Sequence, residues 1–265
     1  MKQLKLMVLT LTLLMGTMFT SCMDSGESGP QQWAGVVKVN DNGYVTFTDA
    51  AGTELIPTNT IPVTLNARMA YIYCQVDEGQ DLSTNPKSIK ITLLADPTGI
   101  DATAITTPKV ESSDVTTNAP VGSLSFASGY STVAPFQFSE NTIVLPVLYR
   151  VKNVTTTEDI KNELAKHTFT LVCYTDDIKS GDTILKLYLR YKVEDEPAAI
   201  AERATRTSSF KAYEISQILR EYTLKSGQAK PAKITIVAQQ NEYNNKLEDT
   251  STIEKVYEIE YKTAE

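Results

Sequence analysis

Trp33-Ala-Gly-Val-Val-Lys-Val39, Asp41-Asn42-Gly43 and Tyr44-Val-Thr-Phe-Thr48 follow one another in the sequence and predict a β-hairpin. Apolar residues recur at alternate positions in the two outer segments, which is typical of strands with one buried face. Asn-Gly between two such segments favours a tight turn, because both residues tolerate a positive φ. This part of the chain therefore predicts β-structure.

Three more segments with strand character follow the hairpin. They are Thr53–Ile56, which ends at Pro57, then Arg68–Val76 and Ser88–Ala95. Five short strands in so short a stretch fit a small closed barrel. We predict an OB-type β-barrel over residues 33–100.

Residues 96–118 have a different composition, rich in Thr, Pro, Ser and Asp, with Pro97, Gly99 and Pro108 interrupting any periodic pattern. A stretch with so many residues that break secondary structure is typical of the boundary between two domains. We place the boundary near Ile100 and expect a second domain over residues 105–265.

Ile184–Val193 has the clearest strand pattern of this second domain, because Leu185, Leu187, Leu189, Tyr191 and Val193 alternate with polar or charged residues. The other strands that we expect are Pro120–Ala127, Asn141–Arg150, His167–Tyr174, a strand that starts after Pro231, and Val256–Tyr261. The pattern predicts a β-sandwich, and the whole chain is expected to be all-β.

Two short helices are expected within the sandwich domain. Thr155–Lys166 has a capping Thr156 and acidic residues in its first turn, and it places Ile160 and Leu164 on one face. Ser216–Lys225 is followed by Gly227, which is typical of a helix end.

Residues 1–21 have the composition of a secretory signal. Lys2 and Lys5 precede the apolar run Leu6–Phe19, which is shorter than the about 20 residues that a membrane-spanning helix needs. Ser21-Cys22 then resembles the cleavage site of a bacterial lipoprotein, although Phe19 stands where Leu is usual. The resemblance implies that Cys22 carries acyl chains such as palmitate and anchors the chain in a membrane, with residues 22–32 as lipidated cysteine and flexible tether. An ordinary secretory signal is the alternative.

The charge of the chain argues against nucleic acid as a partner. The sequence has 25 basic and 32 acidic residues, a formal net charge of −7, and removal of the signal would take away two more positive charges. An acidic protein repels a phosphate backbone and has no polybasic attraction to a membrane surface. A lipid anchor would hold the protein at the membrane instead.

Two cysteines other than Cys22 are present. Cys74 and Cys173 each lie on the apolar face of a predicted strand, in different predicted domains, which favours unpaired and buried side chains. A mutual disulfide is the alternative, since disulfides form outside the cytoplasm.

The sequence offers little with which to build an active site. Its only histidine, His167, follows a predicted helix, where we expect a capping or surface role. HExxH, Cys-x-x-Cys, GxGxxG and P-loop motifs are missing. The acidic groups Asp176–Asp177 and Glu194–Glu196 are expected in solvated turns rather than as paired glycosidase carboxylates. We therefore predict a protein that is not an enzyme and uses no metal or cofactor.

Tyr71 and Tyr73 are the candidate binding residues, because they share the strand face opposite Ile72 and Cys74. Exposed tyrosines on a barrel stack on sugars or anchor a protein partner. The alternative is that these tyrosines are ordinary strand residues.

The whole chain resembles the NigD-like envelope lipoproteins. The resemblance lies in the lipoprotein signal, in WAGVVKVNDNGYVTFTDAAGTELIP with RMAYIYCQVD, and in HTFTLVCYTDD with TILKLYLRYKVED. It implies an N-terminal OB-type domain before a β-sandwich. Glu194–Ser209 departs from the family's pattern, and we expect an inserted helix or loop there. The family was named for a bacteriocin gene cluster, which implies an immunity role as a special case. Because catalytic motifs are missing, we expect a module that binds a protein or peptide of the envelope, and Asp24 and Glu27 after Cys22 favour the outer membrane. An oligosaccharide-binding lipoprotein of a glycan-uptake system is the alternative; oligomeric state stays open.

Overall fold

The computed structural model describes residues 31–41, 43–59, 65–82, 86–112, 115–128 and 131–263. The expected signal, Cys22 and most of the expected tether lie outside these residues. The chain divides into two compact units. The first covers the described residues up to Ala102 together with Ala127–Val133, and the second covers Thr103–Phe126 and Ala134 onward.

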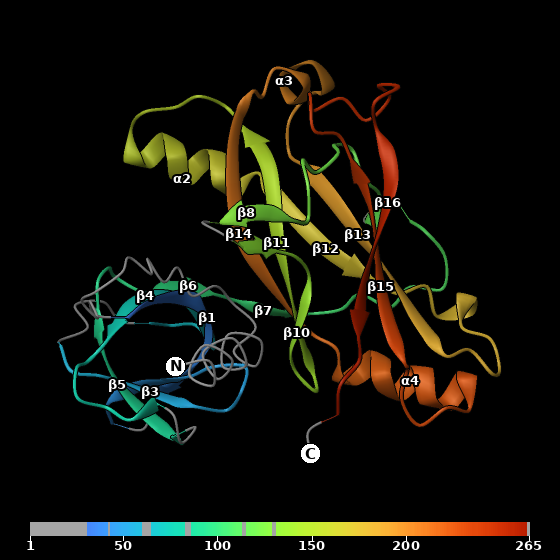
Figure 1. The fold of residues 1–265 in the computed structure, drawn as a ribbon. Helices are drawn as coiled ribbons and strands as arrows, with labels where there is room; N and C mark the ends of the chain where they lie inside the picture. The colour runs from blue at the N-terminus through green and yellow to red at the C-terminus, as the bar shows by residue number, and fades with distance from the viewer. Residues whose placement is uncertain are drawn as a thin grey trace. The chain divides into compact units, whose positions relative to one another are not determined.

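The first unit contains a closed barrel of five strands, as predicted. The strands are β1 (Gln32–Asp41), β2 (Val45–Thr48), β3 (Glu54–Pro57), β4 (Met69–Val76) and β5 (Ser88–Leu93), with β6 (Thr98–Ile100) added beside β4. Their order is β1-β2-β3-β5-β4, and β4 pairs again with β1, which closes the barrel (Figure 1). β3 and β5 pair in parallel and the other neighbours are antiparallel, which is the OB arrangement.

Alternating apolar residues fill the barrel, as their spacing predicts. Val37, Phe47, Ile72 and Ile91 are all buried in its core cluster. The predicted hairpin is present, with Asp41 opposite Val45 and Gly43 at φ +97° in the turn. This positive φ is one that L-residues with a side chain rarely adopt, so the glycine fixes the turn.

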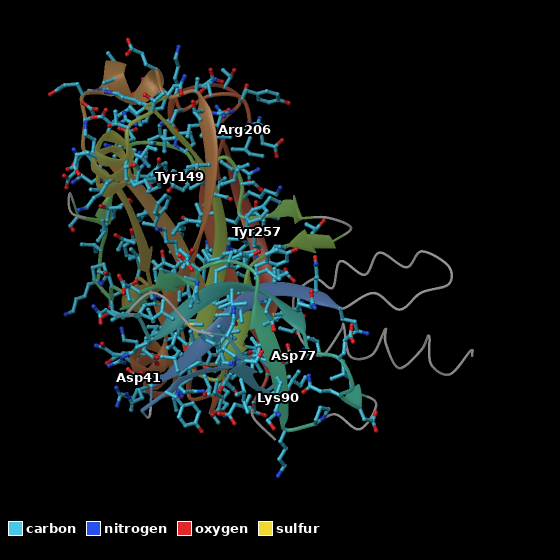
Figure 2. All side chains as sticks on the ribbon, turned by 90° about the vertical axis from the view of Figure 1, so that its left-hand side faces the viewer. Asp41, Asp77, Lys90, Tyr149, Arg206 and Tyr257 are labelled. Carbon is cyan, nitrogen blue, oxygen red and sulfur yellow. The ribbon has the colours of Figure 1, made fainter. Side chains whose placement is uncertain are left out.

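The connection between β4 and β5 is held by one amide side chain. Gln80 Nε2 donates to the carbonyls of Asp77 at 2.9 Å and Lys90 at 2.8 Å, while the Lys90 N–H donates to Gln80 Oε1 at 2.7 Å. Asp77 and Lys90 accordingly lie near each other (Figure 2). These bonds hold the start of the loop against β5.

The second unit is a sandwich of two four-stranded sheets. One sheet contains β10 (Phe136–Ser139), β11 (Thr142–Val151), β14 (Thr205–Glu214) and β7 (Ala102–Ala104), in the order β10-β11-β14-β7. The other contains β12 (His167–Val172), β13 (Ile184–Val193), β15 (Lys233–Gln240) and β16 (Ile253–Glu260), in the order β12-β13-β15-β16. β8 (Phe126–Ser128) and β9 (Ser131–Val133) form a separate two-stranded ribbon, most of which belongs to the first unit.

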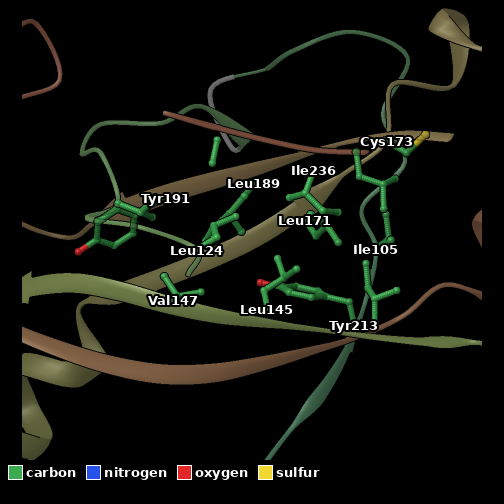
Figure 3. Close-up of a cluster of buried hydrophobic side chains, with 14 of the residues drawn as sticks. Ile105, Leu124, Leu145, Val147, Leu171, Cys173, Leu189, Tyr191, Tyr213 and Ile236 are labelled. Carbon is green, nitrogen blue, oxygen red and sulfur yellow. The ribbon is translucent and has the colours of Figure 1, made fainter. Parts of the chain in front are cut away.

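The core of the sandwich lies between its two sheets. Leu145 and Val147 of β11 meet Leu171 of β12, Leu189 of β13 and Ile236 of β15 in one buried cluster (Figure 3). All five inward residues predicted on Ile184–Val193 are buried. Burial of this apolar surface is the main force that holds the two sheets together.

Three α-helices accompany the sandwich in the described part of the chain, and one of them lies in Glu194–Ser209, the segment expected as an inserted helix or loop. They are α2 (Thr157–Ala165), α3 (Pro197–Ala201) and α4 (Ser216–Ser226). Thr156 caps α2 as predicted, with its hydroxyl accepting from the Asp159 N–H at 3.1 Å. Gly227 ends α4 in the left-handed conformation.

Several predicted boundaries are wrong. Gln32, assigned to the tether, is the first residue of β1. Residues 96–118, expected to interrupt regular structure at the domain boundary, contain β6 and β7. Pro120–Ala127, expected as a strand, forms mainly isolated bridges. Val121 pairs with Gln240 at the end of β15, whereas Ser123 pairs with Leu148 of β11, so the segment crosses from one strand to another and does not extend along either. Glu194–Ser209, expected as an inserted helix or loop, contains α3 and the first half of β14.

Both described cysteines are free and buried, as predicted. Cys74 lies in the barrel core and Cys173 in the sandwich core. Burial, followed by the charges of Asp77 and Asp177 respectively, raises the pKa of each thiol to about 12. A thiol that stays protonated is a poor nucleophile.

Thiol labelling of residues 31–265 is therefore expected to find both thiols in denaturant without reductant, and almost none in native protein. Titration with a chromogenic disulfide reagent measures this directly. Absence of reactive thiol in denaturant would mean that the two cysteines are bonded to each other.

Candidate functional site

Tyr71 and Tyr73 lie on the outer side of β4, where the alternation places them. Ile72 and Cys74 point into the barrel and are fully buried. Tyr73 is 38 % exposed and donates its hydroxyl to Gln32 Oε1 at 2.5 Å. Tyr71 is half-buried, and this burial raises the pKa of its hydroxyl. Of the two, Tyr73 offers the more accessible ring.

Tyr44 is a further exposed tyrosine of the barrel, which the sequence pattern placed within a strand. It lies in the β1–β2 turn and is 70 % exposed. Tyr73 is opposite Ala34, whereas Tyr44 follows the Asp41 end of β1. Seven residues of strand correspond to roughly 24 Å. The exposed tyrosines are thus distributed along the barrel and do not form one stacking platform.

A polar network covers part of the outer face of β1, β2 and β3. Asn40 Nδ2 donates to Thr48 Oγ1 at 2.8 Å, and Thr46 Oγ1 donates to Glu54 Oε1 at 2.9 Å. These side chains satisfy one another. The signal for them in the sequence is the Thr-Phe-Thr alternation of β2, which places both threonines outside.

His167 is buried and does not have the predicted surface or capping role. Its Nδ1 lies 2.6 Å from the Tyr191 hydroxyl, and its Nε2 lies 3.3 Å from Glu163 Oε1. The imidazole also packs 5.2 Å, centroid to centroid, from the Tyr149 ring. The reason is that the first residue of β12 points inward, toward Tyr191 of β13.

Glu163 is the residue that joins this histidine to a larger ion cluster. Arg203 Nε donates to Glu163 Oε1 at 2.7 Å and Arg203 Nη2 to Glu163 Oε2 at 3.2 Å. Arg203 Nη2 also reaches Asp195 Oδ2 at 3.1 Å, and Asp195 pairs in addition with Lys152 and Lys166. The Lys152 N–H donates to Glu163 Oε1 as well, at 2.9 Å. We call these six residues, with His167 included, the ion cluster.

The cluster reverses the expected orientation of α2. Glu163 is the buried residue of this helix, whereas Ile160 and Leu164, predicted as its packing face, are 43 % and 42 % exposed. A buried carboxylate with a full set of donors therefore attaches α2 to the sandwich.

The ion cluster sets the protonation of its members. Burial alone would raise the pKa of the Glu163 carboxyl, but donors from Lys152, Arg203 and His167 hold that pKa below its usual value. Burial lowers the pKa of His167, and Glu163 opposes this only in part. His167 is therefore neutral and Glu163 charged in the folded protein at neutral pH.

The free energy of unfolding is expected to fall as the pH drops below about 6.5, the usual pKa of histidine. Both folded-state pKa values lie below the unfolded ones, so the unfolded chain binds more protons and stability declines with falling pH. Urea unfolding between pH 7.5 and 4 measures this, with at most about 1.4 kcal/mol per pH unit for each proton. His167→Gln should flatten the slope between pH 6.5 and 5; an unchanged slope would show that His167 does not contribute.

Three of the acidic residues considered for catalysis, Asp176, Asp177 and Asp195, are engaged with cations or a hydroxyl. Asp176 Oδ1 accepts from Lys225 Nζ at 3.2 Å, and Asp177 Oδ2 accepts from the Tyr188 hydroxyl at 3.4 Å. Lys152, Arg203 and Lys166 hold the pKa of Asp195 far below its usual value. These carboxylates act as structural partners.

The residues that the structure describes contain no helix long and apolar enough to cross a membrane. No three histidine, cysteine or acidic side chains in them are grouped as a metal site would require.

Comparison with known proteins identifies a close relative of known structure. A Bacteroides fragilis protein described as a "putative lipoprotein" is 94 % identical, with a TM-score of 0.81 over 89 % of this chain and 100 % of that chain. A Bacteroides vulgatus protein of unknown function, DUF1344, shares 12 % identity and a TM-score of 0.55 over 87 % and 91 % of the two chains, which shows a common fold alone. No family model and no curated protein matches.

Proposed function

The chain belongs to the same family as the Bacteroides fragilis protein, and from this premise we propose that it is itself a lipoprotein of the bacterial envelope. The resemblance of Ser21-Cys22 to a lipoprotein cleavage site supports this proposal, with Cys22 as the residue that carries the acyl chains. Several acyl chains hold a protein stably at a membrane, since each buried CH₂ contributes about 0.8 kcal/mol.

The protein is further proposed to act by binding a protein or peptide of the envelope, without turnover. The observation that carries this is the distribution of exposed tyrosines on the barrel. A sugar site gathers aromatic rings around a groove, whereas Tyr73 lies opposite Ala34 and Tyr44 lies beyond Asp41, at the other end of β1. Single exposed tyrosines on a rigid strand suit contacts with another protein surface.

The sequence supports a more specific role and location within this proposal. The NigD-like resemblance favours an immunity-type role, and Asp24 and Glu27 beside Cys22 favour the outer membrane, on its periplasmic or surface face. A tether of about ten residues reaches roughly 35 Å when extended. A partner would therefore lie at or near the same membrane.

Oligosaccharide binding is the second candidate function. OB barrels bind oligosaccharides with the β1–β2 loop and the face of β2 and β3. Tyr44, exposed in that loop, is the observation that favours it.

Photo-crosslinking in cells tests the main proposal. A photoreactive amino acid at position 73 is expected to capture a specific envelope protein, identified by mass spectrometry. The same amino acid at Tyr243, a more exposed tyrosine of the second unit, serves as the control. Saturable binding on a glycan array, lost in Tyr44→Ala and without a protein partner, would favour the second candidate. Catalytic turnover of any bound substrate would overturn both.

A further inference from the structure

Arg150 and Arg206 form a pair of guanidinium groups on the outer face of the β10-β11-β14-β7 sheet. They are direct partners in the antiparallel ladder of β11 and β14. Tyr149 and Val147 of β11 point into the sandwich core, so Arg150 leaves the sheet on the opposite face, and Arg206 leaves it on the same side. Figure 2 shows Tyr149 and Arg206 in this part of the sandwich. Like charges directly opposite each other are unfavourable in a sheet.

The two side chains converge on one acceptor. Arg206 Nη2 donates to the backbone carbonyl of Glu242 at 2.7 Å, and Arg150 Nη2 donates to the same oxygen. The two positive charges therefore lie within about two hydrogen-bond lengths of each other. In the part of the chain that the structure describes, neither guanidinium forms an ion pair.

Arg150 is the more constrained of the two. It is only 5 % exposed, and its Nε has no hydrogen-bond partner among the described residues. Burial and then the charge of Arg206 lower the pKa of its guanidinium. A buried N–H without a partner is unfavourable by about 1–3 kcal/mol, or more for a charged group. Natural proteins rarely leave such a group unsatisfied without a reason.

Arg203 shows how this same protein satisfies a buried arginine. Its guanidinium makes bonds to two carboxylates, Glu163 and Asp195, and to the Ala199 carbonyl. Arg150 and Arg206 share one carbonyl, and among the described residues no carboxylate pairs with either guanidinium. The missing component is a negative charge.

We propose that Arg150 and Arg206 together bind an oxyanion, namely the phosphate, sulfate or carboxylate group of a ligand. Guanidinium N–H groups match the geometry of such anions and form strong charge-assisted hydrogen bonds with them. Arg206 is exposed, so the site is reachable from solvent, and Arg150 supplies the buried, unpartnered donor. The anion would neutralise the repulsion between the two strands. This site lies in the second unit and does not depend on the barrel.

The test follows the arginine Nε–H signals of the ¹⁵N-labelled protein by NMR. Sodium phosphate, sulfate and acetate are titrated separately, with chloride keeping the ionic strength constant. The Arg150 and Arg206 signals are expected to shift saturably, while the Arg203 signal, already satisfied, does not shift. Saturation by acetate alone would assign the site to carboxylates, and saturation by phosphate or sulfate to tetrahedral anions.

Arg206→Gln is expected to weaken the apparent affinity at least tenfold, because it removes one of two charges. Arg220→Gln changes an exposed arginine of α4 and should leave the affinity unchanged. Thermal unfolding gives a second measurement, since saturating anion should raise the Tm of the wild type and not that of Arg206→Gln. The proposal is overturned if no anion gives saturation, if all exposed arginine signals shift alike, or if Arg206→Gln binds as well as the wild type.

Discussion

Glu163→Ala is expected to lower the free energy of unfolding of the sandwich by about 3–5 kcal/mol. The Arg203 side chain is completely buried and would lose its bidentate partner, while His167 would lose the acceptor at its Nε2. Alanine is a good helix former, so helix propensity does not account for the loss. Urea unfolding followed by far-UV circular dichroism measures the change, with the m-value checked for constancy.

Glu158→Ala is the matched control, because Glu158 lies in the same helix and is exposed. A loss of at most about 1 kcal/mol is expected there, from the helix dipole. The double variant Glu163→Leu with Arg203→Met should be more stable than Glu163→Ala, since it removes both buried charges together. Equal stability of Glu163→Ala and wild type would show that the ion cluster does not hold α2.

Cys22→Ala is expected to move the protein out of the membrane fraction completely, either as a soluble protein or with its signal uncleaved. The physical reason is the loss of acyl chains, which no polybasic surface replaces on a chain with a net charge of −7. Detergent phase partition of producing cells, with the size of the product on a gel, measures both outcomes.

Cys74→Ala provides the control for this experiment. Cys74 is buried in the barrel core, so its replacement affects packing but leaves the thiol of Cys22 in place. That variant should partition with the membrane like the wild type. Normal cleavage and membrane partition of Cys22→Ala would contradict the lipoprotein assignment.

The sequence predicts best those strands in which one face is apolar. Ile184–Val193 is β13 with the same bounds, because its inward residues alternate without interruption. β14 was missed for the opposite reason. Its inward positions include Thr207, Ser209 and Lys211, and its ladder with β11 is what makes it a strand. Tertiary pairing overrides a weak local pattern in such cases.

The ion cluster could not be predicted from local sequence. Ile160 and Leu164 have the spacing of a packing face, yet the partner that decides the orientation of α2 is Arg203, 40 residues further along the chain. Likewise, the position of His167 after a helix says nothing about Tyr191, whose hydroxyl lies against the imidazole. The alternation of Tyr71 and Tyr73 with Ile72 and Cys74, in contrast, is local and is confirmed.

If Cys22 is the anchor, the first strand of the barrel would carry any mechanical load on the protein. A chain held through Cys22 would be pulled at Gln32, along the axis of β1. β1 pairs with β4 from Gln32 to Lys38 and with β2 from Lys38 to Asp41. Ladder hydrogen bonds are perpendicular to the strands, so this pull loads them in shear and many must break at once. Drag on the protein would be resisted by the whole ladder instead of opening it bond by bond.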